Sequence, residues 1–324
     1  MSPLHFAWEQ HGTGGLLIWG TSGCDSVQPV THRLLLDTSS LMYRAFFSMP
    51  ISVVGSDGRP VNAVHGYLDM TARLLGDHRP KEAVHVYDAD WRPAARVAIY
   101  AGYKANRQPD PEWLPQQFGI LRETLDALGL PQAEAPGWEA EDAIGVIAAG
   151  ARRGERLDIV TGDRDLIQLV RDPVVRVLFT VRGVSELRIL DEAGVLAKYG
   201  VTASRYLDFA ILRGDPSDGL PGVRGVGEKT ARLLVGAYPD IPSLIADAKA
   251  ERRKGAQLQR SPALRAAIRE AAGYLMDMLA VVPIRTDVGL KEWIRERDEA
   301  RVDEVARAYS LQGPIRRLAR AIAR

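Results

Sequence analysis

Short apolar runs recur through the first 200 residues of the chain, and longer amphipathic stretches separate them. The runs have the length of a buried strand, and the stretches between them repeat apolar positions at the spacing of a helix. This alternation predicts an α/β fold with a mostly parallel central sheet flanked by helices. The predicted strands are Arg33–Asp37, Ala83–Asp88, Leu157–Asp163 and Val174–Phe179, and the predicted helices are Ala63–Leu75, Trp113–Leu128 and Glu139–Ala151.

The strand-like runs end near Val201, and helical patterns follow one another from there. This change of class predicts an α/β domain over residues 32–200 and a helical subdomain over residues 201–324. Residues 1–31 have no apolar period and are rich in Gly and Ser, so they are expected to form a mobile extension. The helices predicted after Val201 are Tyr206–Arg213, Gly227–Gly236, Ile241–Lys249 and Ala263–Leu279.

The amino-acid composition excludes several classes of protein. The only cysteine is Cys24, so the chain can form neither an intramolecular disulfide framework nor a Cys-rich zinc site, and a reducing, cytoplasmic location is expected. No run of about 18 apolar residues occurs, so no membrane span is expected. The net charge is +1, so any basic surface that binds nucleic acid must be offset by an acidic cluster elsewhere.

Acidic residues follow the predicted strands. Asp37, Asp88 and Asp163 each stand at the carboxyl end of an apolar run, which is where open α/β sheets bind their ligands. A single Asp in this position is ordinary, because Asp commonly caps the helix that follows. The same residue type after three strands is less easily explained by capping, so these carboxylates are candidates for a shared site.

Further acids lie at the starts of predicted helices. Glu139, Glu141 and Asp142 open one helix and Asp165 opens another, where acids are also favoured by the helix dipole. If all these acids converge with Asp37, Asp88, Asp163, Asp215 and Asp218, their charges repel unless cations neutralise them. Oxygen ligands without His or Cys favour Mg²⁺ or Mn²⁺ over zinc. Two such ions, about 4 Å apart, would suit phosphoryl transfer.

A basic segment lies between two of the acidic positions. Residues Trp91–Arg107 carry several cations and no acid, and tyrosines are interleaved with them. Cations of this kind follow phosphates and aromatic rings stack on unpaired bases, although a solvated helix face with buried tyrosines would have the same composition. The prolines that follow break the helix, so residues 91–128 are expected to form an arch over the strand ends. The cations are Arg92, Arg96, Lys104 and Arg107.

The stretch Leu220–Leu234 combines a glycine-rich turn with the start of a helix. Gly225 and Gly227 permit a tight turn, and the N–H groups of the next helix would face a phosphate without reading sequence. The stretch nearly matches a nucleotide-binding P-loop, but Glu228 breaks the spacing and no apolar strand precedes it, so that interpretation is rejected. A plain connector between helices remains the alternative.

Taken in order, these motifs resemble the flap endonuclease / 5′-nuclease family, especially the bacterial 5′-nuclease domains attached to DNA polymerase I and their stand-alone relatives. The resemblance covers about Arg33 to Leu290 and implies a PIN-like fold with a helical arch and a helix–hairpin–helix at about residues 204–236. The motifs are LLLDTSSLMYRAFF, VYDAD, YAGYKANR, PGWEAEDAIG, VTGDRDLIQLV, GDPSDGLPGVRGVGEKTA and IRTDVGL.

The resemblance also implies roles for particular residues. Lys104 and Arg107 would act on the scissile phosphate. The first metal would be held by Asp37, Asp88, Glu139, Glu141 and Asp142, and the second by Asp163, Asp165, Asp215 and Asp218. DNA would contact Tyr43, Arg44, Tyr103, Gly225, Val226, Gly227, Lys229 and Thr230, and a K⁺ ion would bind the carbonyls of Val223 and Val226. Arg92 and Arg96 are added to the expected DNA contacts because they belong to the basic segment.

The resemblance predicts a structure-specific 5′-nuclease that trims 5′ ends and cuts 5′ flaps or junctions in DNA. A monomeric, nucleoid-associated and stand-alone nuclease is expected, because no polymerase domain follows Arg324. The sequence departs from the family at Glu141, where Asp is usual, and at Gly219, where Asn is usual. Two alternatives therefore stay open: a junction-binding protein without turnover, and a nuclease that accepts RNA in the 5′ strand.

Overall fold

The computed structural model describes residues 31–250 and 261–323, and a seven-stranded sheet lies at its centre. Strands β1 to β5 run parallel to their neighbours, while β6 and β7 are antiparallel at the two edges, in the order β6-β5-β4-β1-β2-β3-β7. The mostly parallel sheet is therefore confirmed. The strands are β1 (Thr31–Asp37), β2 (Glu82–Tyr87), β3 (Gln132–Glu134), β4 (Glu155–Thr161), β5 (Val175–Arg182), β6 (Glu186–Leu190) and β7 (Lys291–Trp293).

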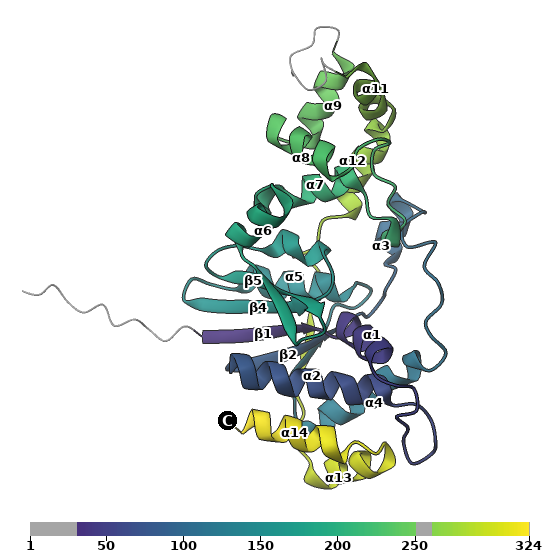
Figure 1. Ribbon diagram of the computed structural model, residues 1–324, viewed down its shortest axis with the longest axis vertical. Coiled ribbons are helices and arrows are strands. Elements are labelled where there is room, and N and C mark those ends of the chain that lie inside the picture. The colour runs from purple at the N-terminus through teal and green to yellow at the C-terminus, as the bar shows by residue number, and fades with distance from the viewer. Residues whose placement is uncertain (1–30, 251–260, 324) are drawn as a thin grey trace, which may run out of the picture.

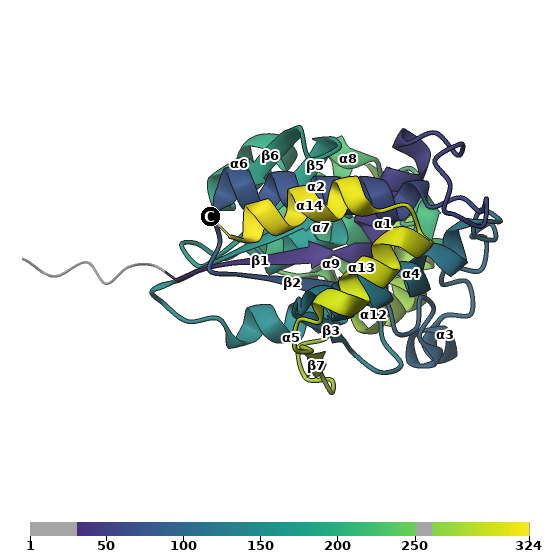
Figure 2. The same ribbon diagram turned by 90° about the horizontal axis from the view of Figure 1, so that it is seen from below.

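Helices cover both faces of the sheet, because neighbouring residues of a strand point to opposite sides. On β1, Leu34 and Leu36 join the apolar core on one face and Leu35 joins the core on the other. Figures 1 and 2 show the first face covered by α1 (Thr38–Ser48), α2 (Asn62–His78), α4 (Leu114–Leu128), α13 (Glu299–Ala308) and α14 (Gln312–Ile322). The second face carries α5 (Ala140–Gly150) and α6 (Glu192–Tyr199).

A helical subdomain stands on the side of α5 and α6 (Figure 1). Its apolar side chains belong to the same continuous core as the sheet, which includes both Ile144 of α5 and Leu275 of the subdomain. Apolar packing therefore holds the subdomain against the sheet. It consists of α7 (Tyr206–Arg213), α8 (Glu228–Ala237), α9 (Ile241–Lys249), α11 (Pro262–Glu270) and α12 (Ala272–Val281).

The stretch expected to be one helix, Ala263–Leu279, is two. The first helix, α11, ends at Glu270, and α12 begins at Ala272. Helix α11 lies on α9, while α12 contacts α7, α9 and the short helix α3 (Ala94–Ile99). Helix α3 is also shorter than expected, since only Ala94–Ile99 of this segment is helical and residues 101–106 form turns.

The end of the chain corrects the predicted boundary of the helical subdomain. Residues 291–323 leave that subdomain and return to the sheet, where Lys291–Trp293 pair with β3. Helix α13 then packs on α4 and α14 packs on α2, with Ile315 and Leu318 buried. A three-residue strand carries too little periodicity to be read from sequence.

The start of the chain also differs slightly from the expectation. Thr31 already belongs to β1, and the remainder of the expected extension, residues 1–30, lies outside the described residues. In the part of the chain that the structure does describe, no helix has the length and apolarity needed to cross a membrane.

A buried ion-pair cluster lies on β4, away from the acids at the strand ends. Asp158 is fully buried and accepts hydrogen bonds from His32 at 2.9 Å and from Arg176 at 2.9 and 3.0 Å. Burial alone would raise the pKa of Asp158, but these hydrogen bonds outweigh it and lower the pKa to about 2. Ionised Asp158 therefore stabilises the fold.

We expect Asp158→Asn to reduce the free energy of unfolding by about 2 kcal/mol at pH 7. Because the folded-state pKa is depressed, the stabilisation by Asp158 is complete above its ordinary pKa of 3.8 and is lost as the pH falls through 2. Urea unfolding of wild type and variant should therefore give curves that differ at pH 7 and approach each other as the pH falls from 4 to 2. A constant difference over that range would contradict the assignment.

Candidate active site

Asp37, the last residue of β1, and Asp88, which follows β2, both accept a hydrogen bond at the start of a helix. Asp37 caps α1 by accepting the N–H of Ser40 at 3.1 Å, and its other oxygen accepts the hydroxyl of Thr161 at 2.6 Å. Asp88 accepts the N–H of Ala140 at 2.7 Å, at the start of α5. Capping and site formation are therefore compatible here, because capping fixes these carboxylates at the edge where the parallel strands end.

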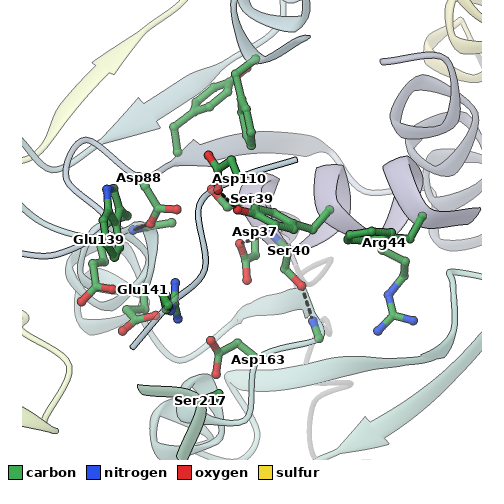
Figure 3. A pocket seen from close by; sticks show the side chains of 18 of the residues that line it. Asp37, Ser39, Ser40, Arg44, Asp88, Asp110, Glu139, Glu141, Asp163 and Ser217 are labelled. Carbon is green, nitrogen blue, oxygen red and sulfur yellow. Dashed lines mark hydrogen bonds between the residues drawn. The ribbon is translucent and has the colours of Figure 1, made fainter. Parts of the chain in front are cut away.

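A cleft of about 1380 Å³ opens at this edge, and several of the predicted acids line it. Figure 3 shows Asp37, Asp88, Glu139, Glu141 and Asp163 around one open space. They come from the ends of β1 and β2, the start of α5 and the loop after β4. Convergence, which the sequence could not show, is thus found for these residues.

The remaining predicted acids except Asp142 lie next to this group. Asp163 accepts the N–H of Asp165 at 2.8 Å, at the start of the turn η1 (Asp165–Leu169). Asp215 caps the short turn η3 (Pro216–Asp218) by accepting the N–H of Ser217 at 3.0 Å. Asp165, Asp215 and Asp218 all act electrostatically on the residues at the cleft, so they extend one acidic region.

The prediction that Asp142 binds a metal is corrected. Asp142 is fully buried and receives two hydrogen bonds from Arg96, at 2.7 and 2.8 Å. Its oxygens also accept the backbone N–H groups of Arg285 at 2.9 Å and Glu139 at 3.2 Å. Both oxygens are thereby occupied within the protein, and Asp142 does not line the cleft.

Four carboxylates in or next to the cleft have raised pKa values. Burial, opposed by the Thr161 hydrogen bond and reinforced by the charge of Asp88, raises the pKa of Asp37 to about 7. Burial likewise raises the pKa values of Glu141, Asp163 and Asp165, and the negative charges of neighbouring acids add to the effect. Desolvated, mutually repelling carboxylates of this kind are stabilised by a cation placed among them.

The donor set fits a hard divalent ion, but the ligands are not gathered into a finished site. Within residues 31–250 and 261–323, no three Asp, Glu, His or Cys side chains lie close enough to hold one ion together. The protein's own cations approach some of these acids instead. Lys104 forms an ion pair with Glu139, and Arg107 donates to Asp218 at 2.8 Å.

Lys104 and Arg107 both line the cleft. Their action on the scissile phosphate stays a prediction. Lys104 is 4% exposed and has a left-handed backbone with φ of 50°. Its N–H donates to the carbonyl of Asp218 at 2.8 Å, which fixes the arch turn (residues 100–107) against the acidic loop around η3. Arg107 is more accessible, with a side chain that is 39% exposed.

Arg96 and Tyr103, predicted to contact DNA, are buried instead. Arg96 is 3% exposed and donates to Glu139 and Asp142 and to the carbonyls of Val281 and Pro283. The hydroxyl of Tyr103 donates to Glu139 at 2.6 Å. Part of the basic, aromatic segment is therefore buried, because the buried acids at the start of α5 need positively charged partners inside the protein.

The other predicted contacts of this region lie at or near the surface. Arg92 is half-buried and donates to the carbonyls of Tyr103 and Ala101, so it braces the arch turn from outside. Tyr43 and Arg44 of α1 both line the cleft. The hydroxyl of Tyr43 contacts Asp110 across the cleft, and Arg44 donates to the carbonyl of Thr180 at 3.2 Å.

Gly219, one of the two departures from the family pattern, has a steric explanation. Its φ is 71°, a left-handed conformation, and a Cβ atom here would lie 2.3 Å from the carbonyl oxygen of Gly102. Such a contact is impossible without moving the arch turn. The glycine therefore permits the close approach between that turn and the acidic loop.

We expect Gly219→Ala to slow DNA cleavage by about 10- to 100-fold, because a displacement of the arch turn by about 1 Å misplaces Lys104 and Arg107. Thermal unfolding should show a folded protein, since the clash is confined to this contact. Cleavage rates at saturating enzyme measure the effect, and Gly154→Ala is a useful comparison because Gly154 is also left-handed, with φ of 97°, but a Cβ there meets no atom within 4 Å. An unchanged rate in Gly219→Ala would remove the proposed role of this contact.

The glycine-rich turn leads into α8 as expected. Gly225 is left-handed with φ of 77°, and Gly227 precedes the first helical residue, Glu228, without a side-chain cap. Gly225, Gly227 and Lys229 are exposed, and Thr230 is half-buried. The first N–H groups of α8 therefore face outward from a surface turn, which is suitable for a phosphate oxygen.

Val223 and Val226 place their side chains in the core below this turn. The carbonyl of Val223 accepts the N–H of Val226 at 2.9 Å. This bond uses one lone pair of the Val223 carbonyl and shapes the turn. Binding of K⁺ by these carbonyls stays a prediction.

Sequence patterns missed several residues that line the cleft. Trp91 is an exposed side chain at the cleft, and Phe118 and Arg122 reach the cleft from α4. Arg122 lies over the ring of Tyr87 at 4.1 Å and donates to Glu134 at 2.8 Å. Only the fold brings α4 to the strand ends, so the helical pattern of Trp113–Leu128 gave no signal of this position.

Comparison with known proteins agrees with this geometry. The family model described as 5′-3′ exonuclease, N-terminal resolvase-like domain, matches residues 32–200. The model described as 5′-3′ exonuclease, C-terminal SAM fold, matches residues 201–304. Together the two models cover most of the chain.

Curated relatives carry corresponding names. A 5′-3′ exonuclease of Streptomyces coelicolor is 44% identical over 305 residues, covering 88% of this chain and 98% of the relative. A 5′-3′ exonuclease of Mycobacterium tuberculosis is 38% identical, covering 89% of this chain and 97% of the relative. DNA polymerase I of Mycobacterium tuberculosis is 40% identical over 84% of this chain, which corresponds to 30% of that polymerase.

Solved structures share the fold at low sequence identity. A structure of T5 5′-exonuclease with bound divalent metal ions (zinc) is 15% identical, covers 90% of this chain and 98% of its own, and has a TM-score of 0.60. The catalytic core of Rad2 in complex with DNA substrate is 13% identical, covers 91% and 92%, and has a TM-score of 0.58. With its family models, its named relatives and the acidic cleft at its strand ends, the chain belongs to the 5′-3′ exonuclease family and is a 5′-nuclease.

Proposed function

We propose that the protein is a metal-dependent 5′-nuclease that removes nucleotides from DNA 5′ ends and cuts 5′ flaps near the junction of single strand and duplex. One observation carries this proposal: carboxylates from separate strand ends line one cleft together with Lys104 and Arg107. Acids that can hold a divalent ion and cations that can bind a phosphate, facing one cleft, suit phosphodiester hydrolysis. The alternative of a junction-binding protein without turnover finds no support among the relatives.

Mg²⁺ or Mn²⁺ is the proposed cofactor, held by Asp37, Asp88, Glu139 and Glu141 on one side and by Asp163, Asp165, Asp215 and Asp218 on the other. Divalent ions at these positions would lower the pKa of a water molecule and offset charge on the phosphate. The T5 5′-exonuclease structure, which contains zinc, supports a divalent ion at a fold of this kind. Glu141 is part of the proposed set, because its longer side chain already reaches the cleft.

The chain's own residues would position the DNA. Lys104 and Arg107 would bind the non-bridging oxygens of the scissile phosphate and stabilise its developing charge. Tyr43 and Arg44, on the wall formed by α1, would contact the strand that enters the cleft. The left-handed turn at Lys104 keeps the ammonium group at the acids rather than in solvent.

The turn before α8 would hold the duplex. Exposed N–H groups of α8, with Lys229 and Thr230, would bind backbone phosphates without reading bases, and K⁺ at the carbonyls of Val223 and Val226 would reinforce this contact. The core shared by the sheet and α7 sets the spacing between this turn and the cleft. The cut would therefore fall at a fixed distance from the gripped duplex, in a monomer.

The test is the position of the cut on labelled substrates that share one duplex and differ in their 5′ strand: blunt, with a DNA flap, and with an RNA flap. Cleavage within a nucleotide or two of the junction on the DNA flap supports the proposal. Comparable cutting of the RNA flap would extend the substrate range to RNA-containing 5′ strands. Cutting scattered through single-stranded DNA, with no dependence on the duplex, would contradict the assigned role of the turn before α8.

A further inference from the structure

Candidate metal ligands of the cleft are engaged with the protein's own cations. Lys104 pairs with Oε1 of Glu139 and approaches Oδ2 of Asp218 at 4.0 Å. Arg107 donates to Oδ1 of Asp218 at 2.8 Å, and Arg164 donates to Asp215 at 3.1 Å. Lys104 and Arg107, which are proposed to bind the phosphate, therefore form ion pairs with carboxylates that are proposed to bind the metal.

The two carboxylate oxygens of Glu139 have different partners. Its Oε2 accepts hydrogen bonds from Arg96 and Tyr103, both at 2.6 Å and both from buried side chains. Its Oε1 is the atom that faces Lys104, which lines the cleft. The inner oxygen is thus fixed by the fold, whereas the outer oxygen is held by a group that a different cation can replace.

We propose that Lys104 and Arg107 act as built-in competitors of the divalent ion: they neutralise Glu139 and Asp218 while metal is absent, and metal binding releases them toward the scissile phosphate. This inference rests on the proposed metal dependence and adds a second role for the two cations. A cation at a carboxylate weakens the binding of a second cation there, because it offsets the negative charge, so loading of metal favours release of Lys104 and Arg107.

Burial makes the exchange necessary. Glu139 is 1% exposed and Asp218 is 6% exposed, and a carboxylate in such a position is strongly destabilised when its counter-charge is removed. Asp218 and the outer oxygen of Glu139 must therefore keep a cation in both states, because Arg96 holds only the inner oxygen of Glu139.

The test measures Mn²⁺ binding without DNA, from the electron paramagnetic resonance signal of free Mn²⁺. Arg107→Met removes the more accessible competitor and Lys104→Met the buried one. Each variant should bind Mn²⁺ more tightly than wild type, by about 5-fold or more. Arg122→Met is the matched control, because Arg122 lines the same cleft but pairs with Glu134, which is outside the proposed ligand set. The control should change the affinity by about twofold or less.

The outcomes separate this inference from the proposed function. If wild type binds no Mn²⁺ at all, the proposed metal dependence fails. If wild type binds Mn²⁺ and the Arg107→Met affinity is unchanged or weaker, the competition is refuted while the metal site stands. An equal gain in Arg122→Met would assign the effect to overall charge and would also refute it.

A second measurement covers the case in which Lys104→Met does not fold. Binding of a 5′-flap duplex is compared in EDTA and in Ca²⁺, a divalent ion that serves here as a probe of binding alone. Released cations should make Ca²⁺ increase the DNA affinity of wild type, and the increase should shrink by about 5-fold in Arg107→Met but not in Arg122→Met. The same Ca²⁺ effect in all three proteins would overturn the proposal.

Discussion

Asp163→Asn should slow cleavage of a 5′-flap duplex by about 10³-fold or more while DNA binding is retained. Asp163 lines the cleft, and in the part of the chain that the structure describes no ion pair involves it. Its side chain accepts the N–H of Asp165 at 2.8 Å, a hydrogen bond that the carbonyl of asparagine can also accept. The substitution therefore removes one negative charge from the proposed metal site and leaves the local fold in place.

Single-turnover cleavage in Mn²⁺ and DNA binding in Ca²⁺ measure the two sides of this prediction. Asp90→Asn is the matched control: Asp90 lines the same cleft but accepts the N–H of Arg92, and it is not among the proposed ligands. Its cleavage rate should stay within about one order of magnitude of wild type. Near-normal turnover in Asp163→Asn would exclude Asp163 as a metal ligand.

Arg96→Ala should reduce the free energy of unfolding by about 3–5 kcal/mol, which is the expected cost of leaving a buried charge without its partner. Arg96 is 3% exposed and joins three parts of the chain: its own helix α3, the acids Glu139 and Asp142 at the start of α5, and the end of α12 with the residues that follow it. Loss of the guanidinium leaves two buried carboxylates short of hydrogen bonds. Cleavage should fall as well, because Glu139 loses the group that orients it.

Urea unfolding at pH 7 measures the stability effect. Arg301→Ala provides a comparison at the surface, where an exposed arginine that pairs with Glu123 and Glu304 should contribute about 1 kcal/mol or less. Combining Arg96→Met with Asp142→Leu should recover part of the lost stability, since an apolar pair can replace a buried ion pair. A loss in Arg96→Ala no larger than that in Arg301→Ala would contradict the buried network.

Much of the sheet could be predicted because buried parallel strands are continuous apolar runs. The runs at Leu34–Leu36 and Ile159–Val160 are fully buried, and the acids that follow them stand at the strand ends as expected. Strand β7 escaped prediction because its three residues include exposed Lys291 and Glu292 and are strand only through pairing with β3.

The direction in which a side chain points was harder to predict than its position in the chain. Arg96 and Lys104 are both cations of one basic segment, yet Arg96 is enclosed behind Glu139 and Lys104 faces the cleft. Asp142 and Glu141 are adjacent, but helix geometry turns one into the core and the other to the cleft. Such choices depend on tertiary partners, which a local pattern does not contain.

The most direct test of the central claim is cleavage of a 5′-labelled flap duplex by the wild-type protein in Mn²⁺, in Mg²⁺ and in EDTA. The account predicts a product cut within a nucleotide or two of the junction in at least one of the two metals and no product in EDTA. Cleavage that persists in EDTA, or tight DNA binding with no cleavage in either metal, would contradict it.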